Sequence, residues 1–136
     1  MTFIPPVVSA FTAGVLIVLQ MALLLSVVVT RRHRRQSLGD GGDSDLLRAI
    51  RRHGNLAENA GIFIAGFTLL ELLGVGRLRL EVICGAFVLG RVSHAIGLSR
   101  KHTVNPFRIG GVFVTVAVGL TLGVWLIRKT LPYMFS

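Results

Sequence analysis

The chain has 136 residues, 52% of them hydrophobic, and its mean hydropathy is +0.71. This composition is too apolar for an ordinary soluble domain of this length and predicts one small membrane domain. The formal net charge of +9 would suggest nucleic acid in a soluble protein. However, the basic residues do not alternate with aromatic ones, and membrane topology accounts for the charge instead.

The first predicted span covers residues 5–30. No side chain between Met1 and Thr30 is charged, and such a run is long enough to cross a bilayer. A signal peptide is the alternative, but no basic residue precedes the apolar run and no small-x-small cleavage motif precedes the arginines. We therefore expect a retained span, which ends at the basic cluster Arg-Arg-His-Arg-Arg of residues 31–35.

A glycine-rich loop, residues 36–44, precedes the second predicted span, residues 45–73, and Asp43 or Ser44 is the expected N-cap. The first half of this helix carries a polar stripe that covers about one third of the circumference at about 100° per residue. The stripe consists of Arg48, Arg51, Arg52, Asn55, Glu58 and Asn59. Charge beside a bilayer is unfavourable unless it faces a partner helix, a cavity or a ligand, so we expect function there.

Two further spans are predicted at residues 78–98 and 107–128. Four spans joined by short loops predict an all-α integral membrane protein, an antiparallel four-helix bundle formed by a single domain, residues 1–136. In the last span, Gly119 and Gly123 are spaced for close helix packing.

Lysine and arginine are distributed unequally between the two ends of the predicted bundle. The end that holds the first and third loops receives 11 of the 15, and the other end receives the remaining 4. The positive-inside rule predicts that the first end is cytoplasmic and that both termini are non-cytoplasmic. Trp125 and Tyr133 suit the membrane interface on the non-cytoplasmic side.

Three polar segments meet at the basic end: the end of the first span, the start of the second, and the corner between the third and fourth. They carry Arg31, Arg32, Arg51, Asn55, Glu58, Arg91, His94, Arg100 and Arg108. This strongly cationic set suits an anionic ligand, because guanidinium groups bind carboxylates through paired hydrogen bonds, and Glu58 would hold an ammonium group. Arg91 lies within a span and needs a partner, for which Glu58 is the candidate.

These residues resemble a known family, the MAPEG superfamily of membrane-associated proteins in eicosanoid and glutathione metabolism. The resemblance rests on Arg51-x-x-x-Asn55-x-x-Glu58 in the second span and on Arg-Val-Ser-His at residues 91–94, and it covers nearly the whole length. Two segments are similar to the bacterial branch in particular: Gly-Asp-Gly-Gly at residues 39–42 and Ala-Ile-Arg-Arg-His-Gly-Asn at residues 49–55.

The resemblance implies a homotrimer that binds glutathione, as a cosubstrate, between neighbouring subunits near the cytoplasmic face of a bacterial inner membrane. The glutathione-binding positions it implies are Arg31 (or Arg32), Arg51, Asn55, Glu58, Arg91 and His94. It implies that Arg108 is the catalytic residue, because a nearby cation favours the thiolate form of a thiol. The expected reaction is conjugation of glutathione to a lipophilic electrophile or reduction of a lipid hydroperoxide.

The pattern departs from many eukaryotic members at hydroxyl-bearing positions. Asn59 and Leu98 stand where those members have tyrosines, and residues 109–112 contain no hydroxyl. The thiolate would therefore depend on Arg108, with Arg100 in reserve.

Several alternatives remain open at this stage. Arg48 and Arg52 are expected to be solvated or to contact lipid headgroups, and Arg51, Asn55 and Glu58 could instead form a structural network between subunits. A non-catalytic membrane scaffold and a small four-span transporter are the alternative functions. A proton-coupled transporter needs an intramembrane carboxylate, however, and the first span has none. No metal site is expected, because the histidines do not share ligand spacing with carboxylates.

Overall fold

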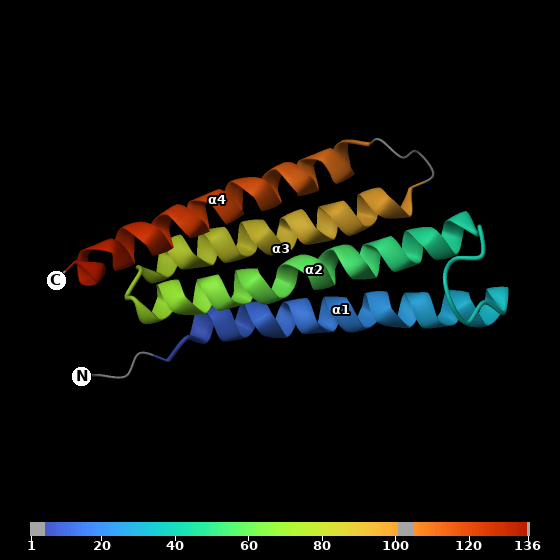
Figure 1. The fold of residues 1–136 in the computed structure, drawn as a ribbon, viewed down its shortest axis with the longest axis horizontal. Coiled ribbons are helices and arrows are strands. Elements are labelled where there is room, and N and C mark those ends of the chain that lie inside the picture. Colours follow the sequence, from blue (N-terminus) through green and yellow to red (C-terminus); the bar gives the residue numbers. More distant parts are fainter. Residues whose placement is uncertain (1–4, 101–104, 136) are drawn as a thin grey trace.

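The computed structural model describes residues 5–100 and 105–135, and this part of the chain forms four antiparallel α-helices without a strand (Figure 1). The helices are α1 (Val7–Arg34), α2 (Ser44–Leu72), α3 (Arg77–Ser99) and α4 (Pro106–Met134). The predicted all-α four-helix bundle is confirmed. The helices α1 and α4 both run beyond the predicted spans, α1 through the basic cluster and α4 past residue 128.

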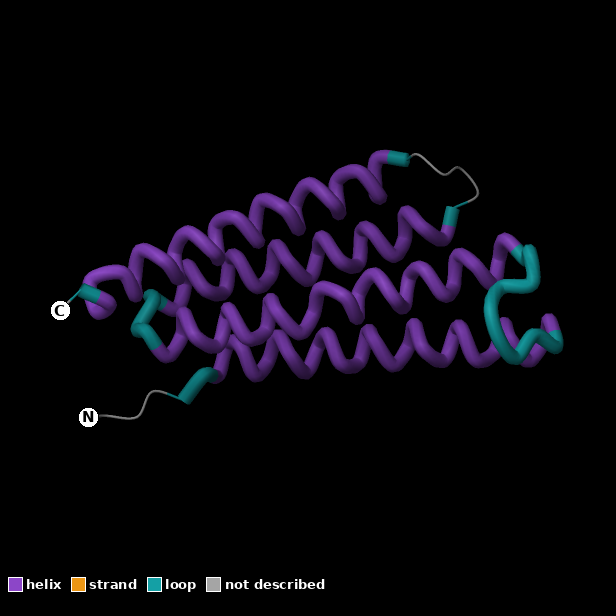
Figure 2. The backbone as a smooth tube through the Cα atoms, viewed as in Figure 1, coloured by secondary structure: helices purple, strands orange, loops and turns teal. Residues whose placement is uncertain are grey.

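The inner pair of helices, α2 and α3, organises the bundle. Each of them contacts all three other helices, whereas α1 and α4 do not contact one another within the described residues. Figure 1 shows α1 and α4 outermost. Both termini and the short α2–α3 turn lie at one end, and the longer α1–α2 loop lies at the other, together with the end of α3 and the start of α4 (Figure 2).

Three of the helices, α1, α3 and α4, are long and apolar enough to cross a membrane. In the most apolar window of α1 and of α4 only 22% of the residues are buried within the bundle, against 39% in α3. The outer helices therefore present apolar surface to lipid. The α2 helix has 29 residues, but its first half is charged, and this polar helix is packed between the others.

The core beside the polar half of the bundle is aromatic. Phe63 of α2 and Phe87 of α3 stack with their ring centroids 4.1 Å apart, and Phe67 meets the edge of Phe87 at 5.8 Å. Beside these rings, Gly66 admits Leu122 of α4, because a Cβ at residue 66 would lie 2.7 Å from the leucine side chain. These contacts fix the register of α2 against α3 and α4 and so position the polar residues one or two turns away.

Two capping residues explain where α2 and α4 begin. The carboxylate of Asp43 accepts hydrogen bonds from the backbone N–H groups of Asp45 and Leu46 at 2.9 and 2.8 Å, as the sequence predicts. The Leu46 bond first, and then the charge of Arg34, hold the pKa of Asp43 below its ordinary value. Because that carboxyl stabilises the fold only while it is ionised, the cap is lost as the pH falls through its folded pKa. The α4 helix is capped by Asn105, whose Oδ1 accepts from a first-turn N–H at 3.0 Å.

The start of α1 is capped by a side chain from another helix, an arrangement that the sequence analysis did not anticipate. Pro6 provides no side-chain acceptor there. Glu71, near the end of α2 and only 8% exposed, accepts from the backbone N–H groups of Val8 and Ser9 at 2.9 and 2.8 Å and from the Ser9 hydroxyl at 2.6 Å. A carboxylate at the positive end of the α1 dipole stabilises that end and ties α1 to α2.

We predict that Glu71→Ala lowers the free energy of unfolding by about 2–3 kcal/mol, because buried donors lose a charged acceptor. Unfolding in detergent followed by circular dichroism measures this loss. Glu81→Ala is the matched control and should change stability little. The Glu81 carboxylate is exposed, and its one ion pair among the described residues is with Arg77. Equal losses in the two variants would contradict the capping role.

Candidate functional site

The centre of the candidate site is Arg91 of α3, which is 4% exposed. Its Nη1 donates to Oδ1 of Asn55 at 2.8 Å, its Nη2 reaches the carbonyl of Gly111 at 3.5 Å, and its guanidinium carbon lies 6.0 Å from the ring centroid of Phe87. The Nε has no hydrogen-bond partner among the described residues. The expected partner Glu58 is exposed, and no carboxylate forms an ion pair with Arg91 in the described part of the chain. A buried positive charge is thus held by neutral groups, with donor capacity to spare.

Close backbone contact between α3 and α4 buries Arg91 and His94, which is 5% exposed. A Cβ at Gly111 would lie 2.6 Å from the carbonyl oxygen of Gly90 and 2.7 Å from the backbone nitrogen of His94. A Cβ at Gly97 would lie 2.5 Å from a backbone nitrogen of the first turn of α4. Small residues at these positions let the two backbones touch, and the polar side chains beside them are shielded from lipid.

Arg108, the predicted catalytic residue, lies half-buried in the first turn of α4. Its backbone N–H donates to Oδ1 of Asn105, while Nδ2 of Asn105 donates to the carbonyl of Gly97 at 2.8 Å. This amide therefore joins the start of α4 to the end of α3. A Cβ at Gly111 would lie 2.7 Å from Cβ of His94, and one at Gly97 would lie 2.8 Å from Cβ of Arg108, so the predicted catalytic and binding residues of α3 and α4 meet where these two helices touch.

Two other arginines considered in the sequence analysis have partners elsewhere. Arg31 donates through Nη1 to three carbonyls of the α1–α2 loop, at 2.9 to 3.3 Å, and so organises that loop. The guanidinium carbon of Arg100 lies 4.4 Å from the ring centroid of Phe107. Among the described residues, neither forms a hydrogen bond with Asn55 or Arg91, which distinguishes both from the central pair.

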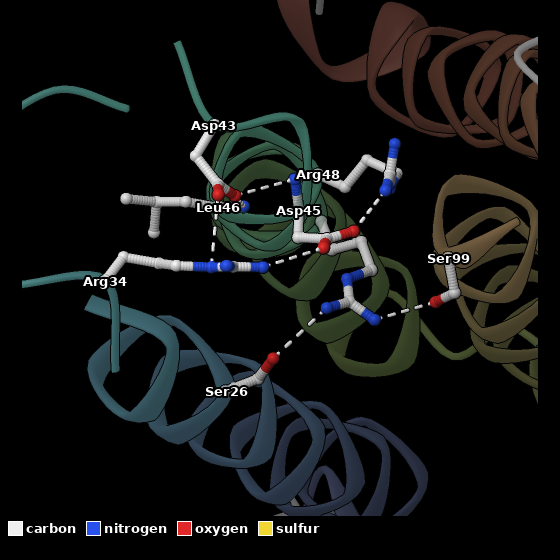
Figure 3. Close-up of polar contacts among 8 residues, drawn as sticks. Ser26, Arg34, Asp43, Asp45, Leu46, Arg48 and Ser99 are labelled. Atoms are coloured by element: carbon white, nitrogen blue, oxygen red, sulfur yellow. Dashed lines mark hydrogen bonds and ion pairs between the residues drawn. The ribbon is translucent and has the colours of Figure 1, made fainter. Parts of the chain in front are cut away.

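Arg52 is half-buried and links three helices. Its Nη1 donates to the hydroxyl of Ser99 on α3 at 2.7 Å, and its Nη2 donates to the hydroxyl of Ser26 on α1 at 3.1 Å (Figure 3). The expectation of a solvated or headgroup-bound Arg52 is therefore wrong. Arg48, one turn earlier, pairs with Asp45 on its own helix near the loop.

The remaining stripe residues share one side of α2 but differ in exposure. Arg51 and Glu58 are exposed, whereas Asn55, between them in sequence, is half-buried and reaches Arg91. The Arg51–Asn55–Glu58 motif therefore runs from the interior to an outer face of the subunit.

Gln20 of α1 is a polar residue that the sequence analysis overlooked. Its Nε2 donates to the carbonyl of His53 at 3.4 Å, and its Oε1 is buried with no partner in the part of the chain that the structure describes, as is Nε of Arg52. Buried polar atoms almost always have partners. Together with Nε of Arg91, these orphaned atoms mark a polar seam through the loop half of the bundle. The sequence signal for this residue was that Gln20 carries an amide within an otherwise apolar run.

Fold and site together define a four-helix integral membrane protein whose inner helices carry a cationic polar cluster. The chain belongs to the MAPEG family, whose model matches residues 9–128, and the resemblance seen in the sequence is confirmed. It is 36% identical over 109 residues to the inner membrane protein YecN of Escherichia coli strain K12. The matched region covers 79% of this chain and 81% of YecN. The YecN protein of Escherichia coli O6:H1 matches with the same identity and coverage. No solved structure matches this chain significantly.

We predict that Gly111→Ala destabilises the bundle by about 1–3 kcal/mol, because the added Cβ would force α4 away from α3. Gly110→Ala is the matched control, since a Cβ at residue 110 meets nothing within 4 Å. Unfolding in detergent, followed by circular dichroism, compares the two. If Gly111→Ala were as stable as Gly110→Ala, the close contact would not be what encloses Arg91 and His94.

Proposed function

We propose that the protein is a membrane-bound glutathione transferase or peroxidase-like protein of a bacterial inner membrane, acting on lipophilic electrophiles or hydroperoxides. The observation that carries the proposal is the state of Arg91. This guanidinium is buried in an apolar bundle, bonded to a neutral amide, and retains an unsatisfied donor among the described residues. A buried charge without an opposite charge is unfavourable, so an anionic ligand that reaches the cluster would be bound strongly.

Glutathione matches the chemistry of the cluster. It carries carboxylates at both ends, an ammonium group, amides and a thiol. In the proposed complex, Arg51 and Arg91 bind carboxylates, Glu58 binds the ammonium group, and Asn55 binds an amide. His94 completes the site on α3. Arg31, through the loop that it organises, closes the cytoplasmic side.

The proposed chemistry begins with the thiolate, which Arg108 stabilises by its charge beside the positive end of α4. In conjugation, the sulfur forms a bond to an electrophilic carbon, the leaving group departs with the bonding electrons, and the thiol proton passes to water. In peroxide reduction, the sulfur attacks the O–O bond and releases an alcohol, and a second glutathione completes a disulfide with loss of water. Both reactions need the same thiolate.

The proposed site is completed by a second copy of the chain. Arg51 and Glu58 are exposed on α2, and a charged side chain that faces lipid is unfavourable. A neighbouring subunit over this face would shield them, and the number of copies, three, is the one that the family resemblance implies. Native mass spectrometry in detergent should detect a trimer. Detection of monomers alone would contradict the proposal that a neighbouring subunit forms part of the site.

A non-catalytic scaffold is the second candidate. It is favoured by the lack of a hydroxyl at residues 109–112 and by Ser93, whose Oγ donates to the carbonyl of Phe107 at 2.9 Å and is thereby engaged. A scaffold would bind glutathione or its partner without turnover. Thiol consumption by the purified protein, with a lipophilic electrophile or hydroperoxide present, separates the two candidates.

We predict that Arg51→Ala weakens glutathione binding by about 1–3 kcal/mol, the usual loss when a charged hydrogen bond is removed. Isothermal titration calorimetry measures the change. Arg79→Ala removes the same charge at the opposite end of the bundle and should leave the affinity unchanged. An unchanged affinity in Arg51→Ala would exclude Arg51 from the site.

We predict that Arg108→Ala preserves the trimer and most of the glutathione affinity but raises the pKa of the bound thiol. The reason is that the cation favours the thiolate over the neutral thiol, so at neutral pH the variant holds less thiolate. Thiolate absorbance followed against pH shows the shift directly. If the titration curves of the variant and the native protein coincide, Arg108 only binds glutathione, and the thiol is activated by Arg100 or by no residue.

A further inference from the structure

The end of the bundle that carries both termini contains a cationic cavity, far along the helices from the cluster described above. Its volume is about 370 Å³, and it lies between the α2–α3 turn and the last turns of α4. The turn residues 74–76 line it together with Arg79, Trp125, Arg128 and Lys129. This volume is within the range of about 300–1,000 Å³ that is usual for small-molecule sites.

The acidic residues at this end are already engaged. Glu71 caps the start of α1, and Glu81 accepts from Nε of Arg77 at 2.7 Å. Arg79, Arg128 and Lys129 form no ion pair within residues 5–100 and 105–135. All the basic residues of this end other than Arg77 therefore converge on one cavity, where their mutual repulsion favours the binding of an anion.

The backbone adds to the positive potential. The α3 helix begins at Arg77, and its N-cap Gly76 lines the cavity without a side-chain acceptor for the first-turn N–H groups. The positive end of a helix dipole favours an anion, and phosphate groups in particular. The site thus rests on three cationic side chains and a cavity, with the helix terminus as an additional contribution.

The position of the cavity identifies the source of the anion. Trp125 belongs to α4, whose apolar surface faces lipid, and tryptophan is enriched where a membrane meets water. Arg128 and Lys129 follow directly on the apolar run of α4. Basic pockets between membrane helices are typical sites for anionic lipid headgroups. We propose that this cavity binds the phosphate of an anionic phospholipid from the adjacent leaflet.

Trp125 provides the test, because it is the single tryptophan of the chain. The full-length protein is reconstituted in phosphatidylcholine vesicles that contain either brominated phosphatidylglycerol or brominated phosphatidylcholine, and quenching of Trp125 fluorescence is measured. We expect the anionic lipid to quench at a lower mole fraction than the zwitterionic one. Equal quenching by the two lipids in the native protein would overturn the proposal without any variant.

Substitutions test whether the preference for the anionic lipid depends on the basic residues of the cavity. Arg79→Gln with Arg128→Gln should reduce the preference for the anionic lipid about fivefold per cation removed. Arg77→Gln is the matched control, because it removes a charge from the same end but from an ion pair outside the cavity. Arg79→Lys with Arg128→Lys, which conserves both charges, should retain most of the preference. An equal loss in Arg77→Gln would indicate general surface potential and would overturn the site.

A competition experiment with inorganic phosphate distinguishes a lipid phosphate from a soluble anion. Excess inorganic phosphate should leave the selective quenching in place, because the lipid is held by its acyl chains as well as by its phosphate. If inorganic phosphate abolishes the preference, the cavity is a site for a free anion and the assignment to lipid is wrong. Helical circular dichroism of each variant ensures that only folded protein is compared.

Discussion

A guanidinium inside a membrane domain has to be enclosed by protein, and this requirement orders the whole bundle. The buried Arg91 and the half-buried Arg52 belong to the inner helices α3 and α2. The outer helices α1 and α4 are apolar and lie beside them. Each of these guanidinium groups then finds neutral oxygen acceptors on neighbouring helices: serine hydroxyls for Arg52, and the Asn55 amide for Arg91. Neutral acceptors satisfy hydrogen bonds without cancelling charge, so the bundle keeps a positive interior.

The enclosure depends on how closely α3 and α4 approach. The sequence analysis expected close packing at Gly119 and Gly123. Gly119 does pack closely, because a Cβ there would lie 3.1 Å from the ring of Phe63 on α2, whereas a Cβ at Gly123 would meet nothing within 4 Å. Backbone contact occurs instead at Gly90 and Gly111. Spacing alone identifies small residues on one helix face, but it does not show which face meets a neighbour or at what depth.

The features that sequence predicts well are local ones. The start of α2 and its Asp43 cap depend on residues within a few positions of one another, and the structure confirms them, whereas α1 and α4 run beyond the predicted spans. Glu71 is 63 positions from Val8 and 62 from Ser9 in the sequence, so no local pattern reveals that it caps α1. Sequence also does not predict whether the Arg52 side chain points into the bundle or away from it, for another reason. A long, flexible side chain near the edge of a polar stripe can reach inward or outward, and only the presence of Ser26 and Ser99 decides between them.

The two cationic ends of the molecule differ in a way that bears on their chemistry. The cavity beside Trp125 offers point charges near lipid, which suits a phosphate. The cluster at the loop end offers amide, imidazole and guanidinium groups at different depths, which suits a ligand with several distinct polar groups. In the proposed reaction the thiolate would be stabilised by the charge of Arg108 and by the α4 dipole, because the Arg108 backbone N–H is already used by Asn105 and residues 109–112 have no hydroxyl. A charge and a helix dipole act over several ångströms without strict geometry. In the proposed reaction they would favour a thiolate in a range of positions, as lipophilic substrates of varied shape require.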